Sequence, residues 1–193
     1  MDRQADDPHD VVSRTERETR AAAEPLPGAE IAERLRARFG EDVPEAEEIH
    51  GQAVVRVTPE RYRDLILTLR DDDELAFDFY DFTSAVDWED AGFDVVTQLY
   101  STTRRHHVRV KVRCSAVDPV CPTIHDLYPG ADWYERETWE LFGIRFDGHP
   151  RLVKLLLPQE FEGYPLRKSF PLMSRVVKQW PGAAEGADEE DDD

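Results

Sequence analysis

The acidic side chains and the histidine between residues 132 and 150 have the types and spacing that proton chemistry needs. On a helix over residues 133–142, at about 100° per residue, Glu135 falls beside Phe142 on the apolar side. A carboxyl in such surroundings has a raised pKa and could act as a general acid or base, with His149 as a second candidate. We favour structural roles for both residues. Glu135 is expected to be the capping partner of Asp132, and His149 to stabilise a turn through a hydrogen bond.

Cys114, Cys121 and His125 are a second group that could do chemistry, as metal ligands. Structural zinc takes four ligands at tighter spacing, and a cysteine-held iron–sulfur cluster takes four thiolates. Two cysteines are also too few for a disulfide scaffold. We expect reduced thiols in a cytosolic protein. The sequence contains no glycine-rich dinucleotide motif, Walker element or nucleophile elbow, so we expect no catalytic, cofactor-binding or metal-binding residue in this chain.

A basic pair, Arg167-Lys168, lies between Tyr164 and Phe170. Arginine makes directional pairs with carboxylates, and arginine and aromatic residues are enriched at binding hot spots. The pattern is typical of an interface anchor, with an ordinary surface pair as the alternative.

The charge distribution limits the classes of partner. The net charge is −18, yet residues 98–182 hold 13 basic and 9 acidic residues. Nucleic acid would be repelled by the whole chain, whereas a protein partner with an acidic surface would suit the basic part. No apolar run approaches the roughly 20 residues of a membrane-spanning helix. The acidic, polar N-terminus is unlike a secretory signal, so we do not expect export.

Hydrophobic periodicity predicts the elements that position these residues. Ile31, Leu35 and Phe39 predict a helix that ends at Gly40, and the valines of residues 54–57 predict a strand. Thr58 is expected to cap a second helix whose apolar face starts at Tyr62.

Three strands are expected next, around residues 77–80, 93–99 and 106–113, the last two joined by a hairpin turn at 101–105. This order predicts an α/β (α+β-like) fold, a two-layer sandwich of helices on a mixed, mostly antiparallel sheet, with a C-terminal extended docking arm.

We divide the chain into a flexible N-terminal arm (1–27), an α/β domain (28–121), a docking segment (122–182) and an acidic disordered tail (183–193). The docking segment is rich in proline, which removes hydrogen-bond donors and restricts the preceding residue. A short helix ending at Gly143 is expected within it, followed by extended chain from Gly148. Such a segment cannot form a core of its own, so we expect it to lie on this domain and on another protein.

The docking segment carries a composite motif. It reads Glu-Arg-Glu at 135–137, Leu-Phe-Gly-Ile at 141–144, Phe146, Gly-His-Pro at 148–150, Leu-Leu-Leu-Pro at 155–158, Glu-Gly at 162–163 and Pro-Leu-Arg-Lys at 165–168. This resembles the 30-kDa subunit family of respiratory complex I, the C-type subunit of NADH-quinone oxidoreductase. The chain departs from the family where Ser169-Phe170-Pro171 replaces the commoner Asp-Tyr-Pro, which removes a carboxylate and a hydroxyl.

The resemblance implies a structural subunit in the hydrophilic peripheral arm of proton-translocating NADH:quinone oxidoreductase, on the cytoplasmic side of the cell membrane. It implies packing on the D-type or 49-kDa-type subunit, with FMN, iron–sulfur clusters, NADH and quinone bound by other subunits. Related chains occur in coenzyme F420-linked dehydrogenases and membrane-bound hydrogenases, and a free acidic adaptor is a further alternative.

The predicted partner interface combines polar and apolar side chains. Its members are Glu135, Arg136, Glu137, Trp139, Phe142, His149, Tyr164, Arg167, Lys168 and Phe170.

Overall fold

The computed structural model describes residues 24–171, so most of the predicted N-terminal arm and the whole acidic tail lie outside the described residues. The described α-helices are α2 (Gly28–Phe39), α3 (Tyr62–Asp71) and α4 (Ala131–Phe142). The strands are β1 (Glu45–Ile49), β2 (Gln52–Val57), β3 (Phe79–Asp87), β4 (Phe93–Tyr100), β5 (His107–Cys114), β6 (Val120–Pro122) and β7 (Arg145–Asp147). Short 3-10 helices are η1 (Gly40–Asp42), η2 (Pro59–Arg61) and η3 (Glu89–Ala91).

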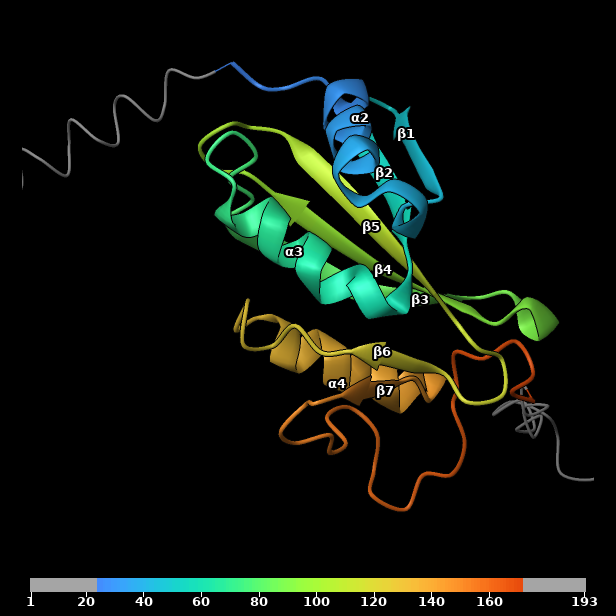
Figure 1. Ribbon diagram of the computed structural model, residues 1–193. Coiled ribbons are helices and arrows are strands. Elements are labelled where there is room, and N and C mark those ends of the chain that lie inside the picture. The colour runs from blue at the N-terminus through green and yellow to red at the C-terminus, as the bar shows by residue number, and fades with distance from the viewer. Residues whose placement is uncertain (1–23, 172–193) are drawn as a thin grey trace, which may run out of the picture.

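Five strands form one mixed sheet in the order β1-β2-β5-β4-β3. The β2–β5 pair is parallel and the other pairs are antiparallel. Helices α2 and α3 cover one face of this sheet, and α4 lies with the small parallel β6–β7 pair beside its β3 end (Figure 1). The predicted fold class, helices on a mixed, mostly antiparallel sheet, is confirmed.

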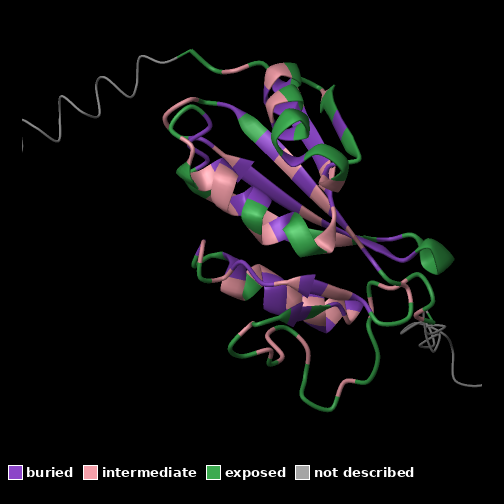
Figure 2. Cartoon of the chain, in the orientation of Figure 1, coloured by how far each residue is buried: buried purple, intermediate pink, exposed green. Residues whose placement is uncertain are grey.

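The core lies between the helices and the sheet. Ile31 and Leu35 of α2 and Leu65 of α3 meet the inward side chains of β2 and β5, and all are almost fully buried. Figure 2 shows this as buried colouring along the central strands and the inner helix faces. The period of about four in α2 and the alternation in β5 therefore mark core positions, as predicted.

Three local predictions need correction. The acidic strand β1 was not predicted; it is an edge strand, and charged side chains are tolerated there. Thr58 precedes the 3-10 turn η2 but makes no side-chain capping bond. Phe77 is a core residue before β3, and that strand instead runs to Asp87. The predicted turn between β4 and β5 is confirmed by the backbone bond from Arg105 N–H to Ser101 O, at 2.8 Å.

The packed body extends past residue 121. Ile124, Phe142, Ile144 and Phe146 belong to the same buried cluster as the sheet residues. The boundary expected between 121 and 122 therefore falls inside this body, because β6, α4 and β7 complete the core. Among the described residues of the predicted docking segment, residues 148–171 follow β7 in extended and turn conformation; they are called the C-terminal arm below.

Within residues 24–171, the helices are too short and too polar for any of them to span a bilayer.

Candidate interaction site

Helix α4 carries half of the predicted interface residues. It follows the Pro129-Gly130 turn and ends at Gly143, whose φ of 73° is the left-handed conformation common after a helix C-terminus. No side chain caps its N-terminus, so the predicted capping role of Asp132 and Glu135 is wrong. The structure gives both residues other partners.

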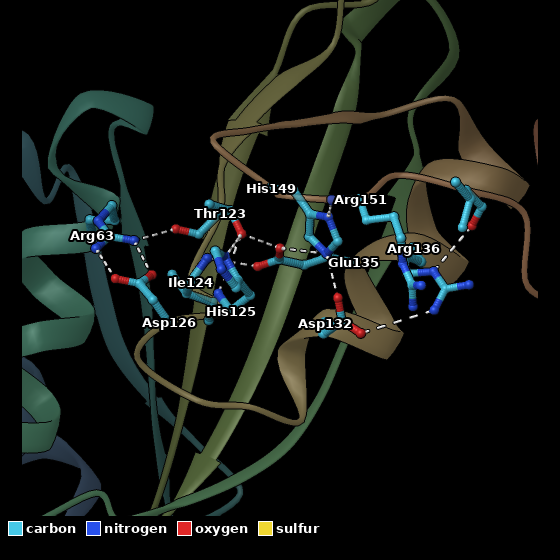
Figure 3. Close-up of polar contacts among 11 residues, drawn as sticks. Arg63, Thr123, Ile124, His125, Asp126, Asp132, Glu135, Arg136, His149 and Arg151 are labelled. Atoms are coloured by element: carbon cyan, nitrogen blue, oxygen red, sulfur yellow. Dashed lines mark hydrogen bonds and ion pairs between the residues drawn. The ribbon is translucent and has the colours of Figure 1, made fainter.

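Glu135 is fully buried and holds the segment between β6 and α4. Its Oε1 accepts the Ile124 N–H at 2.7 Å, and the Thr123 hydroxyl donates to Oε2 (Figure 3). Burial raises the pKa of Glu135 to about 7, although these two hydrogen bonds oppose that shift. The carboxyl therefore titrates near neutral pH. Since it is fully buried, it would influence an interface through the segment it holds.

His149 lies beside two carboxylates of α4. Its Nε2 is 3.2 Å from Asp132 Oδ1 and 3.9 Å from Glu135 Oε2 (Figure 3). Its Nδ1 accepts the Arg151 N–H at 3.1 Å, which places the proton of the neutral ring on Nε2. That buried Nε2 makes no hydrogen bond of good geometry to any residue from 24 to 171. Burial lowers the pKa of His149, despite the nearby Asp132.

Arg63 of α3 connects the helices and sheet of the sandwich to the cluster formed by Thr123, Glu135 and His149. From α3 its guanidinium donates to both carboxylate oxygens of Asp126, each at 2.7 Å, and to Thr123 O at 2.7 Å. This bidentate pair holds the pKa of Asp126 at about 2. The β6–α4 segment is thus fixed from both sides, by Arg63 and by Glu135.

The Glu135 carboxyl is separated from solvent by burial. Glu135 is fully buried, and a pocket of about 600 Å³ elsewhere, between η3 and Arg167, has neither Glu135 nor His149 in its lining. Cys114 and Cys121 are both buried. Among residues 24–171, no group of three or more His, Cys, Asp or Glu is arranged to hold a metal ion.

Glu140 fixes the first half of the C-terminal arm. Its carboxylate accepts the backbone N–H groups of Leu155, Leu156 and Leu157 at 2.8, 2.9 and 2.6 Å. These three donors hold the pKa of Glu140 below its ordinary value, although burial opposes the shift. Sequence analysis did not identify this role of Glu140. The available signal was a run of three leucines before a proline, whose N–H groups have no strand or helix to join.

Arg136 and Lys154 satisfy carbonyl groups of the same segment. Arg136 Nε donates to Val153 O at 3.1 Å. Lys154 Nζ donates to three carbonyls further along, those of Pro158, Gln159 and Phe161, at 2.6–3.1 Å. Side chains of the body and of Lys154 therefore hold the first half of the C-terminal arm through several of its backbone polar groups.

Arg167 fixes the second half of the C-terminal arm. Its Nε donates to Phe142 O at 2.6 Å, and its guanidinium carbon lies 5.0 Å from the ring centre of Phe93 and 4.5 Å from that of Tyr164. Lys168 donates its backbone N–H to Asp87 and its Nζ to Glu89. Both basic residues thus have partners inside the chain.

Gly143 allows the C-terminal arm to approach α4. A Cβ added there would lie 2.6 Å from Tyr164 Cζ and 2.6 Å from Arg167 Nη2. We predict that Gly143→Ala lowers the free energy of unfolding by about 2–4 kcal/mol, from backbone strain and overpacking. Gly51→Ala is the matched control, since Gly51 also has a positive φ, 79°, but nothing within 4 Å; it should cost about 1 kcal/mol. Urea titration of both variants measures the difference, and equal losses would show that the contact at Gly143 contributes nothing.

Several large apolar side chains of α4 and the C-terminal arm face outward. Leu156 is 60% exposed, Trp133 58% and Leu166 50%. Val153 and Tyr164 are also exposed. Of the predicted interface residues, the structure places Tyr164 and Lys168 at the surface, Glu137, Trp139, Phe170, Arg167 and His149 partly inside, and Glu135, Arg136 and Phe142 within the body. Sequence reasoning did not single out Leu156, Leu166 or Val153.

Comparisons with known proteins agree with this geometry. Residues 55–176 match the family described as respiratory-chain NADH dehydrogenase, 30 Kd subunit. The C-type subunit of NADH-quinone oxidoreductase from Roseiflexus sp. (strain RS-1) is 42% identical over 154 residues, which are 79% of this chain and 88% of that protein.

Two solved structures share the fold. A chain of the membrane-bound sulfane sulfur reductase, an archaeal respiratory membrane complex, aligns with a TM-score of 0.65 and 25% identity over 75% of this chain and 85% of that one. A trypsin-resistant fragment of Nqo5 aligns with a TM-score of 0.54 and 28% identity, over 64% of this chain and 97% of the fragment.

Fold and sequence together define the class, an α/β subunit of the kind found in respiratory complexes. Within that class, the chain belongs to the respiratory-chain NADH dehydrogenase 30 Kd subunit family.

Proposed function

We propose that the chain is a structural subunit in the peripheral arm of proton-translocating NADH:quinone oxidoreductase. In this proposal it docks on the 49-kDa-type subunit and has no complete active site. Other subunits bind FMN, iron–sulfur clusters, NADH and quinone. Family membership and the names of the relatives support the complex.

One observation supports docking through the C-terminal arm: side-chain hydrogen bonds within the chain hold part of its backbone, whereas some of its large apolar side chains face outward. Glu140 and Lys154 bond backbone groups of the arm, and Arg167 bonds the Phe142 carbonyl of α4. Leu156 and Leu166 remain exposed. A pre-ordered loop loses little conformational entropy on binding, and exposed apolar side chains on such a loop are typical anchors.

The docking proposal changes the roles of the predicted residues. Arg167 and Lys168 were expected to pair with a partner's carboxylates, but their partners in this structure belong to the chain itself. The direct contacts are therefore assigned to Leu156, Leu166 and Trp133. In the same proposal the chain reaches the cytoplasmic side of the cell membrane through the complex.

We predict that Leu156→Asp reduces the amount of chain retained in the purified complex roughly thirtyfold, because a central apolar anchor contributes about 2 kcal/mol. The isolated chain should unfold at an unchanged temperature, since Leu156 packs little within it. Immunoblotting of the complex and thermal unfolding of the isolated chain measure the two effects.

Ala37→Asp is the matched control. Ala37 is exposed on α2, which lies at the opposite end of the molecule from the C-terminal arm (Figure 1) and before the residues that match the family. The substitution adds the same charge at the surface and should leave retention unchanged. Full retention of the Leu156→Asp chain would refute docking through the C-terminal arm.

An equivalent subunit of a related complex is the second candidate, favoured by the likeness to the archaeal sulfane sulfur reductase chain. F420-linked dehydrogenases and membrane-bound hydrogenases are the forms we consider. The electron donor oxidised by the complex that contains this chain decides between them: NADH supports the first proposal, and reduced F420 or hydrogen the second.

A further inference from the structure

The sheet has a second face, opposite the helices. Along β5, Val108, Val110 and Val112 point into the core, so Arg109 and Lys111, between them, point the other way. In Figure 1, α2 and α3 lie on one side of the sheet, and no helix among residues 24–171 covers the outer side.

The centre of this outer face is basic in a strongly acidic chain. Arg56 and Arg113 both donate to the single buried carboxylate of Asp94, each at 2.6 Å. Arg109 donates to a neutral oxygen, Gln98 Oε1, at 2.9 Å. Lys111 is the cross-strand neighbour of Arg56, and its side chain makes no hydrogen bond or ion pair to any residue from 24 to 171.

The outer face therefore has more basic side chains than acidic partners for them. The four basic residues are Arg56, Arg109, Lys111 and Arg113. Within the described part of the chain, Asp94 and Glu45 are the two carboxylates that form ion pairs with them. Like charges side by side on a sheet are destabilising, so this arrangement costs the isolated chain stability. A carboxylate brought by another molecule would remove that repulsion.

The edge of the same face is apolar. On β3, Phe79 is 50% exposed and Val86 43%, and Phe82 between them is half-buried. The register places Phe82 beside Gln98 and Val86 beside Asp94, so these side chains lie next to the basic row. Trp88, just after β3, is 50% exposed and lies within cation–π distance of Arg113.

We infer that the outer sheet face, defined by Arg109, Lys111 and Arg113 with Phe79, Phe82 and Val86, binds an acidic polypeptide segment of another subunit. The segment lays carboxylates over β5 and apolar side chains over β3. The inference rests on the proposed function, because the occupant belongs to the same complex, but it concerns a surface separate from the C-terminal arm.

The net charge of the chain favours a polypeptide as the molecule that binds the outer sheet face. A chain with net charge −18 is repelled by nucleic acid and by anionic lipid surfaces, which present extended arrays of negative charge. A short acidic segment needs only the local row, and the adjacent apolar residues match a partner that alternates charged and apolar side chains.

The test compares Lys111 in the purified complex and in the isolated full chain. An amine-reactive acetylating reagent should modify Lys111 about tenfold more slowly in the complex, because the interface excludes solvent. A carbodiimide, which joins an amine directly to a carboxylate, should link Lys111 to an Asp or Glu of a different chain, identified by mass spectrometry.

The Lys111→Glu variant gives an independent test, because it should stabilise the isolated chain and weaken its binding in the complex. It relieves repulsion, so the isolated chain should melt roughly 1–3 °C higher. It also repels the acidic segment, so the variant should be stripped from the complex at lower salt. Arg38→Glu makes the same charge change on the exposed side of α2. It should not raise the melting temperature, because Arg38 pairs with Asp72, and it should leave the salt resistance unchanged.

The outcomes separate the two proposals. If the chain is missing from the complex, the proposed function fails. If the chain is present but Lys111 reacts as fast as in the isolated chain, or links only to Glu45 or Asp94 of its own chain, the sheet-face inference fails and the function stands. Protection that disappears when lipid is removed would also overturn it.

Discussion

Replacing Glu140 with glutamine should release the first half of the C-terminal arm while the sandwich stays folded. The amide keeps the size of the side chain but turns an N–H₂ group toward the donors of Leu155, Leu156 and Leu157, so at least one of these N–H groups loses its acceptor. We expect a local loss of about 2 kcal/mol, which makes opening of this loop roughly thirtyfold more frequent.

Trypsin reports that opening directly. Lys154 precedes the leucines, and its Nζ is bonded to three carbonyls in the closed loop. Cleavage after Lys154 should therefore accelerate roughly thirtyfold in the Glu140→Gln chain. Glu137→Gln is the matched control, on the same helix but without a side-chain hydrogen bond to residues 24–171. Equal cleavage rates in the wild-type and Glu140→Gln chains would mean that Glu140 does not hold the loop.

Stability should depend on pH through Glu135. Its pKa is about 7 in the folded chain against an ordinary value of 4.5, so the folded state holds the proton more tightly. Its contribution is favourable to folding below about pH 4.5 and is lost as the pH rises toward and past 7, by about 3 kcal/mol in all. Glu135→Gln mimics the neutral carboxyl: its oxygen can accept the Ile124 N–H, and its amide can donate to Thr123.

Urea titrations of both chains between pH 5 and pH 8 measure this effect. The variant should gain stability relative to the wild type as the pH rises, by about 2–3 kcal/mol across the window. His149 acts with the opposite sign: its pKa is lowered, so its contribution is present above its ordinary 6.5 and is lost as the pH falls below that value. In Glu135→Gln this His149 slope should be the visible one. Parallel curves for the two chains would contradict the role of Glu135.

Much of the sandwich could be predicted because its signals are local. The alternation through Val108, Val110 and Val112 specifies an inner and an outer face by itself, and the recurrence of Ile31, Leu35 and Phe39 specifies a buried helix stripe. The edge strand β1 could not be found in this way. Its glutamates have low strand propensity, and only pairing with β2 makes it a strand.

The candidate site was less predictable, because its bonds join residues far apart in sequence. Position on a helix wheel indicated that Glu135 faces the apolar side, yet its partners Thr123 and Ile124 are set by the β6–α4 packing. Glu140 and Arg136 lie four residues apart on α4, yet each bonds a different set of backbone groups in the C-terminal arm. Helical spacing identifies neighbours within one helix and carries no information about a loop that returns from beyond β7.

The docking claim is tested most directly by placing a photo-crosslinking amino acid at position 156 in the intact complex. If the C-terminal arm is the contact surface, irradiation should join this chain to the 49-kDa-type subunit, and the same probe at position 37 should not. A chain that copurifies with the complex but forms no link from position 156 to that subunit would contradict the account.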